Sequence, residues 1–148
     1  MLDARLPRSR RSFLLLVAIS VFVLGACGGG ASSPTPAPRS LEGTAWRATL
    51  IRDVAPVAGA EATIRFDRGQ AGGTTGCNSY GGAYVAGAGG AFRIESMMMT
   101  EMACDGPRGT QETVVVDILS HADRLEFIDG HLKISGPSGS ITFAEDPR

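Results

Sequence analysis

Residues 124–134 have the sequence RLEFIDGHLKI. Apolar side chains recur at alternate positions on both sides of Asp129-Gly130, and this dipeptide favours the type I′ turn of a two-residue β-hairpin. The segment therefore predicts two antiparallel strands, at 124–128 and 131–134. At least part of the chain is therefore expected to form an antiparallel sheet.

The segments outside the hairpin show the same alternation of apolar and polar residues. Four further strands are expected, each with a pair of apolar residues on one side: 44–50 (Trp46 and Leu50), 62–66 (Ile64 and Phe66), 91–95 (Phe92 and Ile94) and 140–143 (Ile141 and Phe143). Two glycine-dense pieces, 72–76 and 81–86, surround Cys77. Glycine within strands indicates bulges, sharp bends or close backbone approach.

One helix is predicted at 110–122, directly before the hairpin. Thr110 is a suitable N-cap, and Glu112 in the first turn would suit the helix dipole. Apolar residues at helical spacing form one stripe, which consists of Val114, Val115, Ile118, Leu119 and Ala122. Many short antiparallel strands and one late helix predict a mainly β, α+β fold. We expect a small barrel or a strongly curved sheet that the helix covers.

The first 26 residues have the pattern of an export signal. A basic segment precedes an apolar run of 14 residues, 13–26, which is shorter than the roughly 20 residues of a membrane-spanning helix. The run ends in Leu24-Gly25-Ala26-Cys27, which resembles a bacterial lipobox with Cys27 as the lipid-modified residue. Arg10-Arg11 within SRRSFL resembles a twin-arginine signal, and the general secretory route is the alternative.

Residues 27–40 are rich in Gly, Ser and Pro, which predicts a flexible tether between membrane and domain. Removing residues 1–26 takes away four arginines and one aspartate and changes the net charge from −1 to −4. A mildly acidic chain lacks the basic surface that nucleic acids require. It is also not attracted to anionic lipid headgroups, so we expect contact with the membrane only through the acyl anchor.

The mature chain has two cysteines besides Cys27, namely Cys77 and Cys104. Two cysteines in an exported domain most often form a disulfide. A catalytic thiol is the first alternative, with His121 or His131 as its base. A zinc site built from these four residues is the second, but the close ligand pairs typical of zinc sites are absent from the sequence. We expect no bound metal and no cofactor.

Four methionines cluster in the sequence at Met97, Met98, Met99 and Met102. Thioethers are soft ligands that can bind Cu(I). Methionine also fills gaps in a core and forms adaptable apolar contact surfaces, so these three hypotheses remain open. Asn78 and Tyr80, beside Cys77, are interpreted as a turn former and as partly buried packing.

Several elements together are similar to the META domain family, which includes the heat-shock protein HslJ. They are LEGTAW at 41–46, GCNSYGGAY at 76–84, TEMAC at 100–104, Glu112 and the closing hairpin. The resemblance implies a domain over residues 41–145 with a lipocalin-like, barrel-like fold and one helix. It also implies that Cys77 and Cys104 are partners, and it does not imply an enzyme. Glu101 departs from the family, whose members often have Arg there.

The sequence therefore predicts a non-catalytic lipoprotein of the cell envelope that binds a partner or supports envelope stress resistance and integrity. The expected partner is another envelope protein or an apolar small molecule, and the expected state is a monomer. Two alternatives belong to other classes of function. One is a thiol-disulfide redox protein that uses Cys77 and Cys104, and the other is a Cu(I) binder that uses the methionines.

Overall fold

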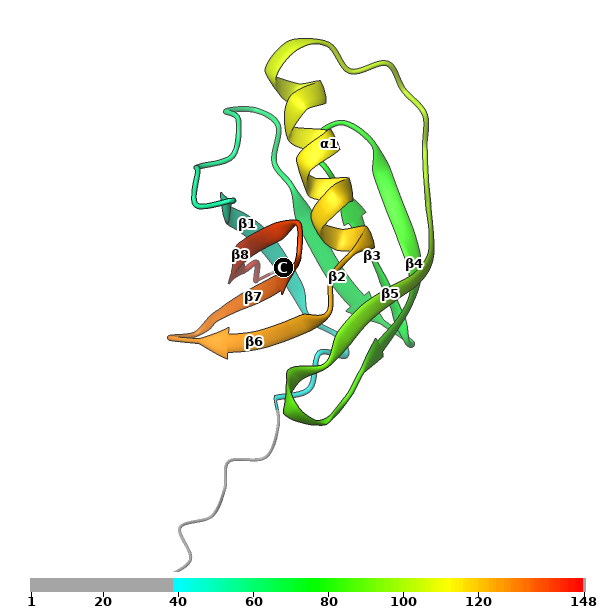
Figure 1. Cartoon of the computed structure of the whole chain (residues 1–148), viewed down its shortest axis with the longest axis vertical. Coiled ribbons are helices and arrows are strands. Elements are labelled where there is room, and N and C mark those ends of the chain that lie inside the picture. Colours follow the sequence, from blue (N-terminus) through cyan, green and yellow to red (C-terminus); the bar gives the residue numbers. More distant parts are fainter. Residues whose placement is uncertain (1–38, 148) are drawn as a thin grey trace, which may run out of the picture. The chain divides into compact units, whose positions relative to one another are not determined.

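The structure is a computed structural model that describes residues 39–147 and consists of one sheet and one long helix (Figure 1). The predicted signal (1–26), the lipidation site Cys27 and most of the tether (27–40) lie outside the described residues. The strands are β1 (Ala45–Ile51), β2 (Thr63–Asp67), β3 (Gln70–Thr74), β4 (Ser79–Ala86), β5 (Phe92–Met99), β6 (Arg124–Ile128), β7 (His131–Gly136) and β8 (Gly139–Glu145). The helix α1 spans Gly106–Ser120, and a short 3₁₀ turn, η1, spans Ala88–Gly90.

All eight strands form one antiparallel sheet with the order β5-β4-β3-β2-β1-β8-β7-β6. The sheet curls until its two edges approach each other, and an isolated bridge joins Ala91 to Arg124. Helix α1 lies across the remaining opening and packs against β5, β7 and β8 (Figure 1). This arrangement confirms the mainly β fold with a strongly curved sheet and one covering helix.

The hairpin of β6 and β7 forms in the predicted register. Asp129 and Gly130 have φ angles of 50° and 81°, and two successive positive φ angles are what a type I′ turn requires. Leu125 pairs with Ile134 across the two strands. The side chain of Ile134 is fully buried, so the alternation in the sequence correctly indicated which face packs inward.

The core lies between the concave face of the sheet and the helix. The predicted inward pairs of β2, β5 and β8 are all buried, as are most of the apolar residues predicted on the helix. Tyr80 is more deeply buried than expected, and its hydroxyl donates to the Thr63 carbonyl at 2.9 Å. The largest fully buried side chains include Trp46, Phe66, Phe143, Leu132 and Ile118. Within residues 39–147, no helix is both long and apolar enough to cross a membrane.

The prediction for Leu50 is wrong, because β1 contains a bulge. Ala48 pairs with Phe143 and Leu50 pairs with Thr142, so the register shifts by one residue between them. An extra residue in one strand turns the following side chains to the opposite face. Leu50 is therefore 38% exposed, and Ile51 takes the inward position instead.

The predicted start of the helix is also wrong. The helix begins at Gly106, with Asp105 in the N-cap position and proline at the start of the first turn, where proline is well tolerated. Thr110 lies inside the helix, and its hydroxyl donates to the Gly106 carbonyl at 3.3 Å. Because the helix starts earlier, Glu112 lies in its second turn, outside the first turn in which a carboxylate interacts with the helix dipole.

Candidate functional site

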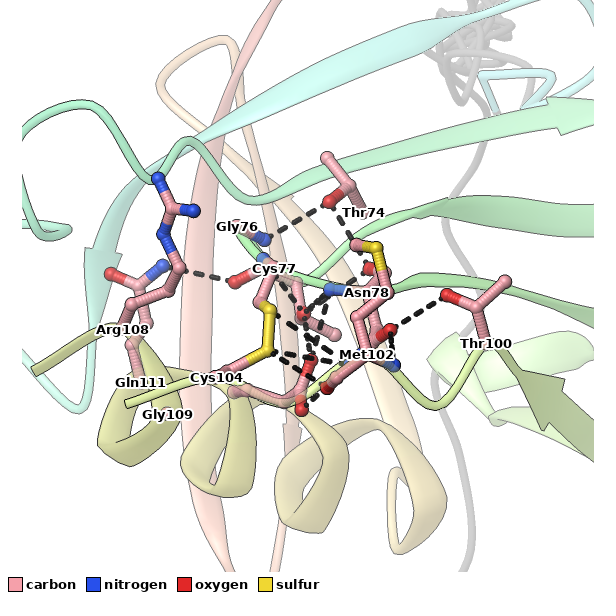
Figure 2. Close-up of a disulfide and its surroundings, with 12 residues drawn as sticks. Thr74, Gly76, Cys77, Asn78, Thr100, Met102, Cys104, Arg108, Gly109 and Gln111 are labelled. Carbon is pink, nitrogen blue, oxygen red and sulfur yellow. Dashed lines mark hydrogen bonds between the residues drawn. A yellow bond between two sulfur atoms is a disulfide. The ribbon is translucent and has the colours of Figure 1, made fainter. Parts of the chain in front are cut away.

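The disulfide between Cys77 and Cys104 is present, and the two Cα atoms lie 6.3 Å apart. Cys77 belongs to the loop between β3 and β4, and Cys104 to the segment between β5 and α1. The bond therefore joins two connections that are 27 residues apart in the sequence (Figure 2). It confirms the predicted pairing, and it leaves neither thiol free as a nucleophile in this oxidised state.

Asn78 is the centre of the hydrogen bonds around the disulfide, and only 2% of its surface is exposed. Its Oδ1 accepts from the Met102 amide at 2.8 Å and from the Thr100 hydroxyl at 2.7 Å. Its Nδ2 donates to the Met102 carbonyl at 3.0 Å and lies 3.4 Å from the Cys104 sulfur. The segment before α1 is thus held to the β3–β4 loop by one side chain as well as by the disulfide (Figure 2).

Glu112 completes this network from the helix. Its carboxylate accepts from Asn78 Nδ2 and from the Asn78 amide, both at 3.0 Å, and from the Thr75 hydroxyl at 2.7 Å. Burial acts to raise the pKa of Glu112, but the hydrogen bonds from Thr75 and Asn78 outweigh it and hold the pKa below its ordinary value. The carboxylate is therefore anionic at neutral pH and is a weak base.

A second buried amide, that of Gln111, holds the loop before β2 against the helix. Gln111 Nε2 donates to the Ala60 carbonyl at 2.6 Å and to the Thr75 carbonyl at 2.9 Å. Its Oε1 accepts from the Val57 amide at 2.7 Å. Gly76 passes beside this amide with a φ of +99°, and a Cβ there would lie 2.5 Å from Gln111 Nε2. Both the conformation and the space at this position therefore require glycine.

The helix approaches the disulfide segment so closely that it needs a glycine at the contact. A Cβ on Gly109 would collide with the carbonyl oxygen of Cys104. This approach explains why a glycine lies within α1, although glycine weakens a helix. The same approach places Gln111 and Glu112, one turn or less further along the helix, within hydrogen-bonding distance of their partners.

The two histidines do not join the cysteines. His121 follows the last residue of α1, and its Nδ1 lies 2.9 Å from the Asp117 carbonyl and 3.2 Å from the Asp117 carboxylate. His131 is exposed at the start of β7, where its Nδ1 lies 3.2 Å from the Asp129 carbonyl. The hypotheses of a histidine-activated thiol and of a Cys/His zinc site therefore have no support in this arrangement.

The four methionines are divided between interior and surface. Met97 and Met99 pack against the core, whereas Met98 and Met102 are exposed. Neighbouring residues of a strand point to opposite faces, so Met97 and Met98 cannot serve one compact site on β5 together. Core filling explains Met97 and Met99, and the Cu(I) hypothesis stays a prediction for the exposed pair.

The sequence did not identify the role of Asn78 or of Glu112. The local pattern predicts a turn former at Asn78 and a partner of the helix dipole at Glu112. Their partnership joins residues 34 positions apart, which no local spacing can indicate. The signal that pointed to the site was the joint occurrence of the GCNSY and TEMAC elements.

A shallow apolar groove lies beside this network, between α1 and the segment that follows β1. Its volume is about 560 Å³. Val54, on one wall, is 66% exposed, and Arg52 at the rim is fixed by an ion pair with Asp117 at 2.8 Å. The lining residues are Ile51, Arg52, Val54, Ala55, Val57, Pro107, Thr110, Gln111 and Val114.

Together, the curled sheet, the covering helix and the disulfide network define a class of small, cross-linked β domain whose polar cluster is internally hydrogen-bonded. The META domain pattern matches residues 39–147. The chain therefore belongs to the META domain family. The predicted resemblance to the HslJ-like family is consistent with this assignment.

Solved structures show the same fold. The chain is similar to a protein from Burkholderia xenovorans whose structure was determined by NMR, with a TM-score of 0.59 and 25% identity over 80% of this chain and 97% of that one. A second NMR structure has a TM-score of 0.58 and 16% identity, over 70% of this chain and 90% of that one. No curated protein is significantly similar in sequence.

Proposed function

We propose that this chain is a non-catalytic lipoprotein of the cell envelope whose META domain binds an apolar small molecule. The observation that carries the proposal is the groove between α1 and the segment after β1. It is mostly apolar, and its volume of about 560 Å³ lies within the range of small-molecule sites. A standard protein–protein interface needs a much larger contact area than the surface of this groove. We therefore favour a small ligand over a protein partner.

The groove is supported on both sides by fixed contacts. Gln111 Oε1 accepts a hydrogen bond from the Val57 amide, and both residues line the groove. The turn at Arg52 is fixed by the ion pair with Asp117 and by a hydrogen bond from Arg52 Nε to the Ser138 carbonyl at 2.8 Å. A groove that is formed before binding avoids the cost of ordering its walls.

The contacts of the polar cluster support binding over catalysis. Glu112 is the carboxylate of this cluster, and its lowered pKa makes it a weak general base at neutral pH. The sulfurs are joined to each other. A domain of this kind offers a rigid frame for the groove, and the disulfide would stabilise that frame after export.

The anchor is supported by the pattern of residues 24–27 and by the tether that follows it. We propose that Cys27 carries the lipid and that the domain lies at the extracytoplasmic face of the membrane. Cells fed a palmitate analogue should label the wild-type chain, and Cys27→Ser should abolish the label. Equal labelling of both forms would exclude Cys27 as the anchor.

The groove is tested with residues 27–148 carrying Cys27→Ser, and with the neutral apolar dye N-phenyl-1-naphthylamine. The dye should fluoresce when it binds, and Val54→Asp should weaken binding about tenfold by placing a charge in the groove. Ile128→Asp is the matched control, because Ile128 is exposed and apolar but lies on β6, away from the groove. Equal binding by all three chains would refute the groove as the binding site.

A further inference from the structure

The cluster around the disulfide contains a third potential metal ligand. The two sulfurs of Cys77 and Cys104 and a carboxylate oxygen of Glu112 all lie within 4.8 Å of one another. These three residues come from two connecting loops and the helix, so the fold alone brings them together. Of the described residues, this is the one group of three or more His, Cys, Asp or Glu side chains that meets this distance.

We propose that reduction of the Cys77–Cys104 disulfide converts this cluster into a Zn²⁺ site with two thiolates and the Glu112 carboxylate as ligands. This inference goes beyond the proposed binding function and does not depend on the groove. Zinc in proteins prefers four tetrahedral ligands and accepts both Cys sulfur and carboxylate oxygen. With three protein ligands, water would take the fourth position.

The geometry requires only small movements. Zinc–ligand distances of about 2.0–2.3 Å place tetrahedral ligand atoms roughly 3.5–3.8 Å from one another. The two Cα atoms are 6.3 Å apart, so the sulfurs can separate to that distance by side-chain rotation after their bond is broken. The carboxylate oxygen already lies within 4.8 Å of both sulfurs.

Glu112 is oriented for this role by its hydrogen bonds. Oε2 accepts from Thr75 and from the Asn78 amide, while Oε1 accepts one hydrogen bond, from Asn78 Nδ2. A carboxylate oxygen has two lone pairs, so Oε1 retains one for a metal ion. Asn78 would then act from outside the ligand shell, where such hydrogen bonds fix the orientation of a ligand.

The chemistry balances with a cellular dithiol as reductant. The dithiol transfers two electrons and two protons to the disulfide, which yields two thiols, and the dithiol itself becomes a disulfide. Zn²⁺ then displaces both thiol protons into solvent, and two Zn–S bonds and one Zn–O bond form. The same free thiols exist before export, because the cytosol keeps cysteines reduced.

The test uses the mature chain with Cys27→Ser, which removes the third thiol. The protein is reduced with a phosphine, which is then removed under anaerobic conditions. The reduced chain is titrated with Co²⁺, and then with Zn²⁺ in competition with a chromophoric chelator. We expect one ion per reduced chain, tetrahedral Co²⁺ bands with a sulfur charge-transfer band, and no binding to the oxidised chain. Absence of binding to the reduced chain would refute the site.

Variants separate the carboxylate from the thiols. Glu112→Gln should weaken Zn²⁺ binding tenfold or more, whereas Glu101→Gln, which alters an exposed acid near Cys104, should bind as the parent does. Unchanged affinity in Glu112→Gln overturns the proposal. X-ray absorption of the Zn²⁺-loaded parent gives an answer that needs no folded variant. Two sulfurs with oxygen neighbours support the site, and any other sulfur count refutes it.

Discussion

At the scale of single residues, Asn78 is the side chain on which the site most depends. Its side chain hydrogen-bonds both to the segment before α1 and to Glu112 on the helix, and so joins three elements at one residue. Polar groups that lose a buried partner cost about 1–3 kcal/mol each. The removal of Asn78 therefore affects several elements at once.

We expect Asn78→Ala to lower the free energy of unfolding by about 3 kcal/mol, because it leaves the Met102 amide and the Glu112 carboxylate short of partners. Urea denaturation of the oxidised chain measures this change. Ser79→Ala, at the exposed neighbouring position, serves as the control and should change stability by less than about 0.5 kcal/mol. A similar small effect for both variants would show that the network contributes little.

Glu112 should make the free energy of unfolding decrease as the pH falls into the acid range. Its pKa in the folded chain lies below the ordinary value of 4.5, because the hydrogen bonds from Thr75 and Asn78 overcome the opposing effect of burial. The unfolded chain therefore binds a proton first as the pH falls. The stabilisation is complete above about pH 4.5 and is lost as the pH drops through the folded-state pKa.

Urea unfolding midpoints between about pH 6 and pH 3 measure this dependence. In Glu112→Gln the decline toward acid should be shallower, since that group no longer titrates. Glu126→Gln is the comparison, because Glu126 also has a lowered pKa, caused first by its hydrogen bond from Arg124, but it lies in an exposed ion pair. If Glu126→Gln flattened the profile as much as Glu112→Gln, the network would not be the source of the pH dependence.

At the scale of elements, the contact between α1 and the segment before it outweighs helix propensity. Alanine normally stabilises a helix relative to glycine by about 1 kcal/mol. At position 109, however, the added Cβ would collide with the Cys104 carbonyl, which is backbone and cannot rotate away.

We therefore expect Gly109→Ala to destabilise the chain by about 2 kcal/mol, within the range for overpacked sites. Thermal unfolding by circular dichroism measures the effect. Ser120→Ala, at an exposed position at the other end of α1, should be neutral or slightly stabilising. A higher melting temperature for Gly109→Ala would mean that the helix can move away from Cys104.

The disulfide links the same elements covalently. It closes a loop of 27 residues, for which chain entropy predicts a stabilisation of about 3.5 kcal/mol. Cys77→Ser combined with Cys104→Ser should lose about that amount in urea unfolding. The reduced parent chain without added metal should show a similar loss. A loss below about 1 kcal/mol in both would indicate that Asn78 and Glu112 hold the segment without the bond.

At the scale of the whole molecule, the sequence predicted what depends on local periodicity and failed where distant segments meet. Ile64 and Phe66 alternate without interruption, and both are buried as expected. Leu50 was misplaced because the bulge in β1 is defined by its pairing with β8, about 90 residues later in the sequence. Asn78 was misjudged for the same reason, because its partners come from other elements.

This long-range pairing gives the last prediction. β8 is not an edge strand, although it lies at the end of the chain, because it pairs with β1 on one side and with β7 on the other. It also carries Ile141 and Phe143 into the core. Among the described strands, β8 alone pairs with both β1 and β7, so without it the sheet would separate there and β1 and β7 would become additional open edges.

Deletion of residues 139–148 should therefore abolish cooperative unfolding, although it removes under a tenth of the chain, while deletion of 147–148 should leave it intact. The physical reason is that the core is shared by both halves of the sheet, so neither half can bury its apolar face alone. Amide chemical-shift dispersion and the urea transition of each shortened chain measure the result. A well-dispersed spectrum from the longer deletion would mean that β1–β5 and α1 form an independent folding unit, and the sheet would have to be described as two.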